Sequence, residues 1–509
     1  MTVARRRLAW GGSALLTLAP GETLAHGIGQ RYDLPVPLWL WAAAAAVAVA
    51  LSFVIIGLFV KASPGVRGYW RLNLLRFPLG RLLAHRRVRL AARLLSVALL
   101  ALVLVASFAG NESPTRNIAP TFIWVAWWVG LAYLSALVGN LWAVINPWAA
   151  VFGWAETLLG SRRTTRRYPA GVGVWPAVGL FLAFAWIELI YTGRSIPAQL
   201  GRLIVGYSVL TWTGMALFGR ATWLRHGDPF AAAFGVLARF APTEIRAADR
   251  EACRRCELPC AGRDGACLDC GECFDRGAPA RREWSARPFA AGLLNTADVS
   301  PSMVMFVLLL LSTVTFDGFT ATPAWAGLEG ALYAALTPLG EARLTVIGTV
   351  GLVAFPLLFV LVYLGFARWM AWMGDDQLTT GTVARLFVLS LVPIAIAYHL
   401  AHYFTYLLIQ GQLLIRLASD PLGFGWDLLG TARYRPDIGI VGARFVWYTA
   451  VVAIVLGHVI AVYVAHVVAL REFRDRRAAL RSQLPMLVLM VGYTVVSLWI
   501  IAQPIVESR

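Results

Sequence analysis

Residues 38–60 read LWLWAAAAAVAVALSFVIIGLFV, a run without a single charged side chain. A helix of about 20 such residues crosses a hydrocarbon core of about 30 Å. Comparable runs recur along the 509-residue chain, which is 59% hydrophobic and 14% charged, whereas roughly a quarter of a soluble domain is charged. The mean hydropathy is +0.67. This composition excludes a soluble globule, a disordered chain and a fibre, and it predicts an all-α polytopic membrane protein in contact with lipid.

The loop that follows this run sets the orientation. Residues 61–93 contain one lysine, eight arginines and no acidic residue, and positive charge in short loops marks the cytoplasmic side of a bacterial inner membrane. Alternation then places the Arg-rich loops 146–171, 219–301 and 469–483 in the cytoplasm. The net charge of +18 therefore reflects topology, and no nucleic-acid partner is predicted. Ten transmembrane helices are expected, at residues 38–60, 94–110, 121–145, 172–192, 199–218, 302–319, 344–367, 386–409, 444–468 and 484–503.

These spans divide the chain into a signal peptide, two groups of helices and one insert. Residues 26–218 contain the first five spans, residues 219–301 form a cytoplasmic insert, and residues 302–509 contain the last five spans with their outer loops. No internal repeat is evident in this pattern, so an inverted-repeat transporter is not predicted.

Residues 1–25 resemble a secretory signal peptide. Three arginines at positions 5–7 precede the apolar residues 8–18, and small residues lead up to Ala25. Cleavage after Ala25 would leave His26 as the extracytoplasmic N-terminus, where its amine and imidazole suit a metal such as Cu(II). The alternative is that His26 merely follows a cleavage site.

All six cysteines of the chain lie in the insert, within 21 residues. They are arranged as CxxC, a further cysteine, and CxxCxxC, and they are Cys253, Cys256, Cys260, Cys267, Cys270 and Cys273. A CxxC turn directs two sulfurs at one point, so two such groups can hold one ion or cluster. Disulfides are disfavoured in the cytoplasm. The four sulfurs of the two CxxC groups would serve zinc, whereas CxxCxxC resembles an iron–sulfur run, and both alternatives stay open.

A second group of candidate residues lies inside the predicted spans. His399 and His402 are three residues apart and share one helix face, while His458 lies in the next span and Glu188 and Asp317 in two others. Ionisable side chains inside a membrane are costly and face the bundle interior, where they mark functional sites. Imidazoles and carboxylates together suit a divalent transition metal, and two facing histidines can also hold haem. The plainer alternative is hydrogen bonding to nearby hydroxyl or carbonyl groups.

Five short segments resemble a family of multispanning bacterial and archaeal membrane proteins labelled fenitrothion hydrolase. The segments are residues 26–29 (HGIG), 33–38 (DLPVPL), 146–148 (NPW), 315–318 (TFDG) and 399–402 (HLAH). The resemblance implies hydrolysis of organophosphate triesters by an activated water. The chain lacks the HxH pair and bridging lysine expected of soluble metal-dependent triesterases.

Two functions are therefore carried forward. In the first, the protein is a metal-dependent hydrolase of a lipophilic small molecule. His399, His402 and His458 bind the metal, Asp317 is a ligand or the general base, and Glu188 is its alternative. In the second, it is a metal-handling or redox membrane protein in which the intramembrane histidines relay a metal or hold haem. The cysteine cluster then senses metal or passes electrons.

Overall fold

A computed structural model describes residues 32–61, 69–160, 166–169, 171–249, 251, 253, 256, 267–296, 299–503 and 506–507. The predicted signal peptide, His26 and Cys260 lie outside these residues. The described chain is mostly helical, which confirms the predicted class. Within it, nine helical stretches are long and apolar enough to span a membrane. They are α1 (Leu38–Phe59), α3 (Arg86–Ala109), α4 to α5 (Ile118–Leu137), α9 (Pro197–Phe218), α14 (Pro301–Thr320), η6 with α16 (Thr337–Met373), α17 to α19 (Thr380–Ser419), α20 (Ala443–Glu472) and α21 (Arg476–Ala502).

The remaining predicted span, 172–192, corresponds to the shorter helix α8 (Trp175–Leu189). The pairing of the first and last described strands indicates how many times the chain crosses the membrane. Strand β1 (Tyr32–Asp33) precedes α1 and pairs in parallel with β6 (Val506–Glu507), which follows α21. Paired strands lie on one face of the membrane, so the chain between them crosses it an even number of times. Nine long stretches and α8 satisfy this condition.

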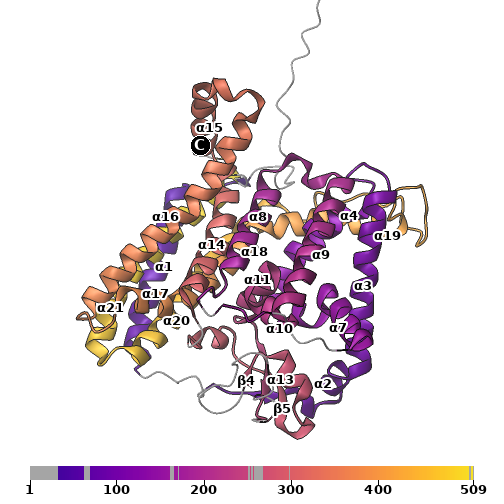
Figure 1. Cartoon of the computed structure of the whole chain (residues 1–509). Coiled ribbons are helices and arrows are strands. Elements are labelled where there is room, and N and C mark those ends of the chain that lie inside the picture. The colour runs from indigo at the N-terminus through magenta and orange to yellow at the C-terminus, as the bar shows by residue number, and fades with distance from the viewer. Residues whose placement is uncertain are drawn as a thin grey trace, which may run out of the picture.

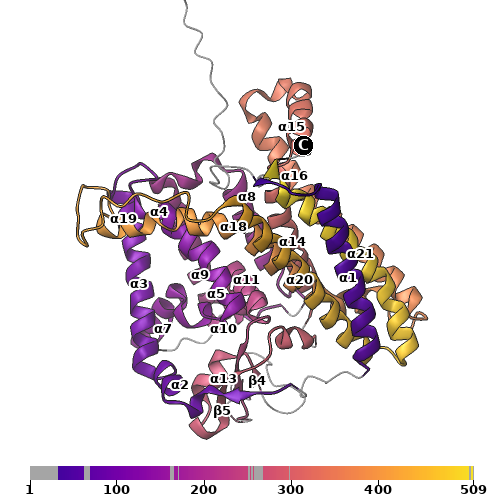
Figure 2. The same ribbon diagram turned by 180° about the vertical axis from the view of Figure 1, so that it is seen from behind.

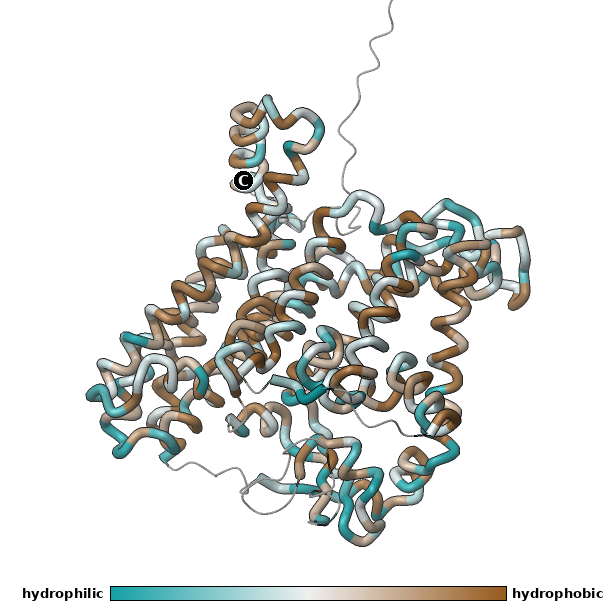
Figure 3. The backbone as a smooth tube through the Cα atoms, viewed as in Figure 1, coloured by the Kyte–Doolittle hydropathy of each residue, from teal (hydrophilic) through white to brown (hydrophobic). Residues whose placement is uncertain are grey.

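A four-stranded sheet defines the other face. Its order is β2 (Leu72–Asn73), β5 (Arg282–Ala286), β3 (Thr243–Ala247) and β4 (Cys267–Leu268), and all neighbours are antiparallel. The sheet joins the Arg-rich loop after α1 to the cysteine insert, so both lie on the same face, hereafter the insert face (Figure 1). Hydrophilic residues gather in this region, whereas the long helices are mainly hydrophobic (Figure 3).

The helices pack in sequence-distant pairs around one large core. Helix α20 contacts α1, α18 and α21, and α14 contacts α8, α16 and α18. Figure 2 shows α1 and α21 side by side at one flank, with α3 at the other. Helix α14 begins cleanly because the Ser300 hydroxyl accepts a hydrogen bond from Met303 N and Pro301 occupies the first turn. From there it runs through the core, and most of its side chains are buried.

Two short helices begin with related sequences and are capped in the same way. Residues 146–153 read NPWAAVFG and residues 228–235 read DPFAAAFG. They begin α7 (Pro147–Leu159) and α11 (Pro229–Ala238), and in each helix the capping side chain, Asn146 or Asp228, accepts from the third backbone N–H beyond it.

The flanking elements extend the likeness. A spanning stretch and a short helix, α6 (Trp142–Ile145) or α10 (Arg220–His226), precede each copy. A helix with proline in its first turn, α8 or α14, follows each copy. Glu188 and Asp317 both lie in the last turn of that helix.

The remaining elements include short helices and parts of the spanning stretches. They are η1 (Leu74–Arg76), α2 (Pro78–Leu83), η2 (Phe122–Gly130), η3 (Thr192–Ser195), α13 (Gly271–Arg276), η4 (Pro279–Arg281), η5 (Ala291–Leu294), α15 (Pro323–Ala335), η6 (Thr337–Ala342), η7 (Val388–Leu391), α18 (Val392–Gln410) and α19 (Leu413–Ser419). Helix α11 lies within the range predicted as insert, yet its ten residues pack inside the bundle against α5 and α8.

Candidate functional site

Asp317 is the centre of a hydrogen-bonded group between α14 and α18. One of its oxygens, Oδ2, accepts from His402 Nε2 at 2.8 Å and from the Tyr403 hydroxyl at 2.6 Å. The carboxylate is 21% exposed and the His402 side chain only 4%. The pair lies near the end of α14 that is remote from the insert face. Asp317 and His402, two residues selected from the sequence, are therefore in direct contact.

Glu188 approaches the same group from α8. Its Oε1 accepts from the indole N–H of Trp128 at 2.8 Å, and Glu188 lines a small cavity together with Tyr403. Trp128 belongs to η2, a π-helical segment within the third spanning stretch. Such wider turns often occur at functional sites, because they change the direction of side chains. Tyr403 therefore donates to Asp317 and also lies beside the cavity that Glu188 lines.

A small cavity adjoins these residues. Its volume is about 30 Å³, and its lining includes Glu188, His399, Tyr403, Thr313 and Leu237. A single water needs about 10–15 Å³ by this measure, so there is room for about two waters. Nε2 of His399 is buried without a hydrogen-bond partner in the described part of the chain. Leaving a buried polar atom unpaired costs roughly 1–3 kcal/mol, which a water in the cavity would offset.

His458 lies apart from this group, against α21. Its Nδ1 faces the Ile454 carbonyl at 2.8 Å, and its ring centre is 5.9 Å from that of Tyr493. The Tyr493 hydroxyl pairs with Thr315 at 2.6 Å, two residues before Asp317. Both His458 and Thr315 are almost fully buried. Thr315, Tyr493 and His458 thus form a second polar group in the core, on another side of α14 from Asp317.

His466 stands eight residues after His458, which corresponds to about 12 Å along the helix. It bonds to Gln483 at 3.0 Å and to the Val60 carbonyl at 2.9 Å. Val60 ends α1 on the insert face. Polar side chains therefore occur at intervals across the depth of the bundle.

The cysteines form a separate buried cluster on the insert face. Cys253, Cys267 and Cys273 have sulfurs within 4.8 Å of one another, and so do Cys256, Cys270 and Cys273. Among the described residues these are the groups of three or more potential metal ligands. The cluster can hold a metal, as predicted, with five of the six cysteines brought together. The intramembrane histidines and carboxylates do not form such a group within the described ranges.

Local structure explains how the sulfurs converge. Cys267 ends strand β4, Asp269 turns the chain with a positive φ of 53°, and Cys270 precedes helix α13, which carries Cys273. Hydrogen bonding from Cys267 outweighs the opposing effect of burial and lowers the pKa of Cys270 to about 4. A thiol of that pKa is a thiolate at neutral pH, which is the form that binds metal.

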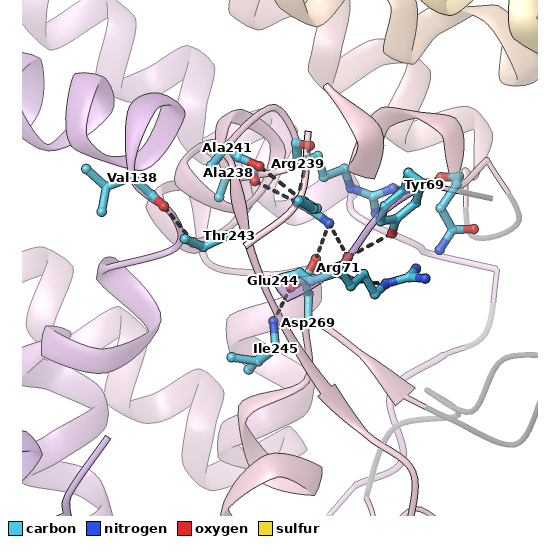
Figure 4. Close-up of polar contacts among 12 residues, drawn as sticks. Tyr69, Arg71, Val138, Ala238, Arg239, Ala241, Thr243, Glu244, Ile245 and Asp269 are labelled. Carbon is cyan, nitrogen blue, oxygen red and sulfur yellow. Dashed lines mark hydrogen bonds and ion pairs between the residues drawn. The ribbon is translucent and has the colours of Figure 1, made fainter. Parts of the chain in front are cut away.

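A buried ion pair ties this cluster to the membrane bundle (Figure 4). Glu244 on β3 accepts from Arg287 Nη1 at 2.8 Å, from Arg71 Nε at 2.5 Å and from the Tyr69 hydroxyl at 2.8 Å. Arg287 also donates to the carbonyls of Ala238, Arg239 and Ala241, at and just beyond the end of α11. The insert, the Arg-rich loop and α11 thus meet at one carboxylate.

The sequence analysis missed several of these residues. Tyr403 follows His402 and lies one turn from His399, so the shared helix face was a usable signal. Trp128, Glu244 and Arg287 carry no such signal, because their partners are distant in sequence. No family model, curated protein or solved structure matches this chain. The findings establish a multi-span helical membrane protein with a cysteine cluster able to hold a metal.

Proposed function

We propose that this chain binds and transfers protons through the Asp317 site of the membrane bundle, with the cysteine cluster as a thiolate metal centre beside it. The observation that carries the proposal is Asp317 Oδ2, which accepts from both His402 and Tyr403 within an apolar bundle. Each of the three groups can gain or lose a proton, and short hydrogen bonds join them. Carboxylate and imidazole chains of this kind are typical proton relays in membrane proteins.

The similar positions of Glu188 and Asp317 support a transport role. Glu188 and Asp317 occupy equivalent turns of α8 and α14, and these two helices pack against each other. In transporters built from repeats, the coupling-ion site lies at the interface between repeats. A Tyr403 hydroxyl in reach of both carboxylates would let a proton pass from one to the other.

The polar groups beyond the site suggest the route. Thr315, Tyr493 and His458 form a second polar group in the core, and His466 lies at the insert face end. The gap of about 12 Å between the two histidines would require water molecules. On this proposal the route connects the two faces of the membrane.

The cavity volume favours a proton over an organic substrate. Ligand pockets typically measure about 300–1,000 Å³, whereas the cavity beside Glu188 holds about 30 Å³. An organophosphate triester or a haem would need a large rearrangement to enter there. A metal held by His399, His402 and His458 would need these rings to converge, whereas His402 is engaged with Asp317 and His458 faces Tyr493.

The test is proton flux in vesicles. The full chain would be reconstituted with a pH-sensitive dye inside, and valinomycin with potassium would clamp the membrane potential. We expect an external acid step to acidify wild-type vesicles faster than protein-free vesicles. Asp317→Asn should reduce the rate to the protein-free level.

Glu341→Gln provides the matched control, because Glu341 is an exposed acid in η6. It should retain the wild-type rate. Wild-type flux in Asp317→Asn would reject the site, and flux no faster than that of empty vesicles in the wild type would reject proton transfer by the isolated chain.

A further inference from the structure

The sulfurs of the cysteine cluster are too far apart for all of them to bind one metal ion. A zinc–sulfur bond is about 2.3 Å, so two sulfurs on the same ion are at most about 4.6 Å apart and about 3.8 Å apart at the tetrahedral angle. Sulfurs within 4.8 Å of one another, a distance close to this limit, form two groups of three and no group of four among the described residues. The four sulfurs of the two CxxC turns therefore do not converge on a single point.

The turns Cys253–Cys256 and Cys267–Cys270 are instead each divided between the two groups, whereas Cys270 and Cys273 share one group. The first cysteine of each turn, Cys253 and Cys267, belongs to one group, and the second, Cys256 and Cys270, belongs to the other. The sulfurs of Cys256 and Cys270 are 3.7 Å apart, which matches the tetrahedral separation. Cys273 belongs to both groups and its residue is fully buried.

We infer that the insert binds two metal ions that share the Cys273 sulfur as a bridging thiolate. One ion is held by Cys253, Cys267 and Cys273, and the other by Cys256, Cys270 and Cys273. A thiolate sulfur has more than one lone pair, so it can bind two ions at once. Zinc is the metal class that these all-sulfur, closely spaced ligands suit best.

Burial gives this arrangement a structural consequence. Cys253, Cys267, Cys270 and Cys273 are all at least nine-tenths buried, and together with Ala247 they form the small core of the insert. Five sulfurs at such short separations would repel one another as thiolates, and two divalent cations would offset four of the five negative charges. The ions would then supply folding free energy that the scarce apolar residues cannot.

The test is the metal stoichiometry of the full chain. The zinc, iron and sulfide contents of the detergent-purified protein would be measured as isolated, and zinc would be measured again after the protein is stripped of metal, loaded with Zn²⁺ alone and desalted. We expect two zinc ions per wild-type chain. Cys253→Ser and Cys256→Ser should each retain one ion, because each removes a ligand from a different ion, and Cys273→Ser should lose both.

Glu283→Gln is the control, since Glu283 lies in the same sheet but outside the cluster; it should retain two ions. One zinc per wild-type chain would overturn the inference. So would iron with stoichiometric sulfide in the protein as isolated, which would identify an iron–sulfur cluster. The wild-type count decides the matter even if the serine variants fail to fold. It is independent of the proton site, because flux through Asp317 is measured separately.

Discussion

Glu244→Gln should loosen the insert from the membrane bundle. The Glu244 side chain is completely buried and that of Arg287 is 2% exposed. Removing the charge of one partner leaves the other buried and uncompensated, which typically costs about 3–5 kcal/mol. Arg287 would keep its bonds to three backbone carbonyls and a longer approach of 3.7 Å to Asp269. We therefore expect a loss near the lower end, about 3 kcal/mol.

Hydrogen exchange followed by mass spectrometry on the full chain in detergent measures this loss locally. Since about 1.4 kcal/mol corresponds to tenfold, amides of β3 and β5 should exchange roughly 100-fold faster in the variant. Glu283→Gln removes a half-exposed partner of Arg246, 3.6 Å away in the same two strands. Such a pair is worth at most about 1 kcal/mol. Equal exchange rates in the two variants would refute the claim that the Glu244 network joins insert and bundle.

Four further predictions follow from other contacts. Burial alone would raise the pKa of Glu244, but Arg287, Arg71 and Tyr69 outweigh it and lower that pKa below its ordinary 4.5. The ionised Glu244 should therefore stabilise the insert above about pH 4.5, and this stabilisation should disappear as the pH falls below that value. Hydrogen exchange of the β3 amides, measured as the pH is lowered, would detect the loss. Gly318→Ala should destabilise the bundle by about 1–3 kcal/mol and lower its unfolding temperature, because the added Cβ would lie 2.6 Å from the Tyr398 hydroxyl and 2.9 Å from Ile500. The control Gly365→Ala has open space around the added Cβ, so it should not lower the unfolding temperature. His402→Ala should reduce proton flux without changing the zinc content, and the loss of a bound metal would instead support the predicted histidine metal site. A reporter fused after Arg276 and one fused after Arg433 should lie on opposite sides of the membrane, and labelling on the same side would contradict the ten crossings.

The hydropathy pattern was sufficient to predict the helical membrane fold, because each long span is stable on its own in lipid. Each of the nine long stretches and α8 overlaps a predicted span, although the ends of five stretches differ by six to ten residues. Helix α11 was missed, because ten apolar residues are too few to span and nothing local shows that they pack inside the bundle. The likeness of residues 146–153 and 228–235 is too short to have indicated from sequence that both begin capped helices.

The candidate sites were predicted unevenly. The cysteine spacing identified a metal-binding cluster, but the spacing alone favoured one ion held by both CxxC turns, whereas the sulfur positions divide each turn between two groups. Asp317 and His402 were selected as ionisable residues inside spans, and the structure brings them into contact. Tyr403 and Trp128 complete the group through contacts between helices that are far apart in sequence. The hydrophobic periodicity of one helix does not show which distant helix it contacts.

The central claim is that Asp317 and Glu188 exchange a proton within the membrane bundle. The most direct measurement is pH-difference infrared spectroscopy on the lipid-embedded full chain, which detects the carbonyl stretch of a carboxyl group as it gains or loses its proton. The account predicts a carboxyl signal in the wild type and in Glu341→Gln that is lost in Asp317→Asn and altered in Glu188→Gln. A wild-type signal that persists unchanged in both Asp317→Asn and Glu188→Gln would contradict it.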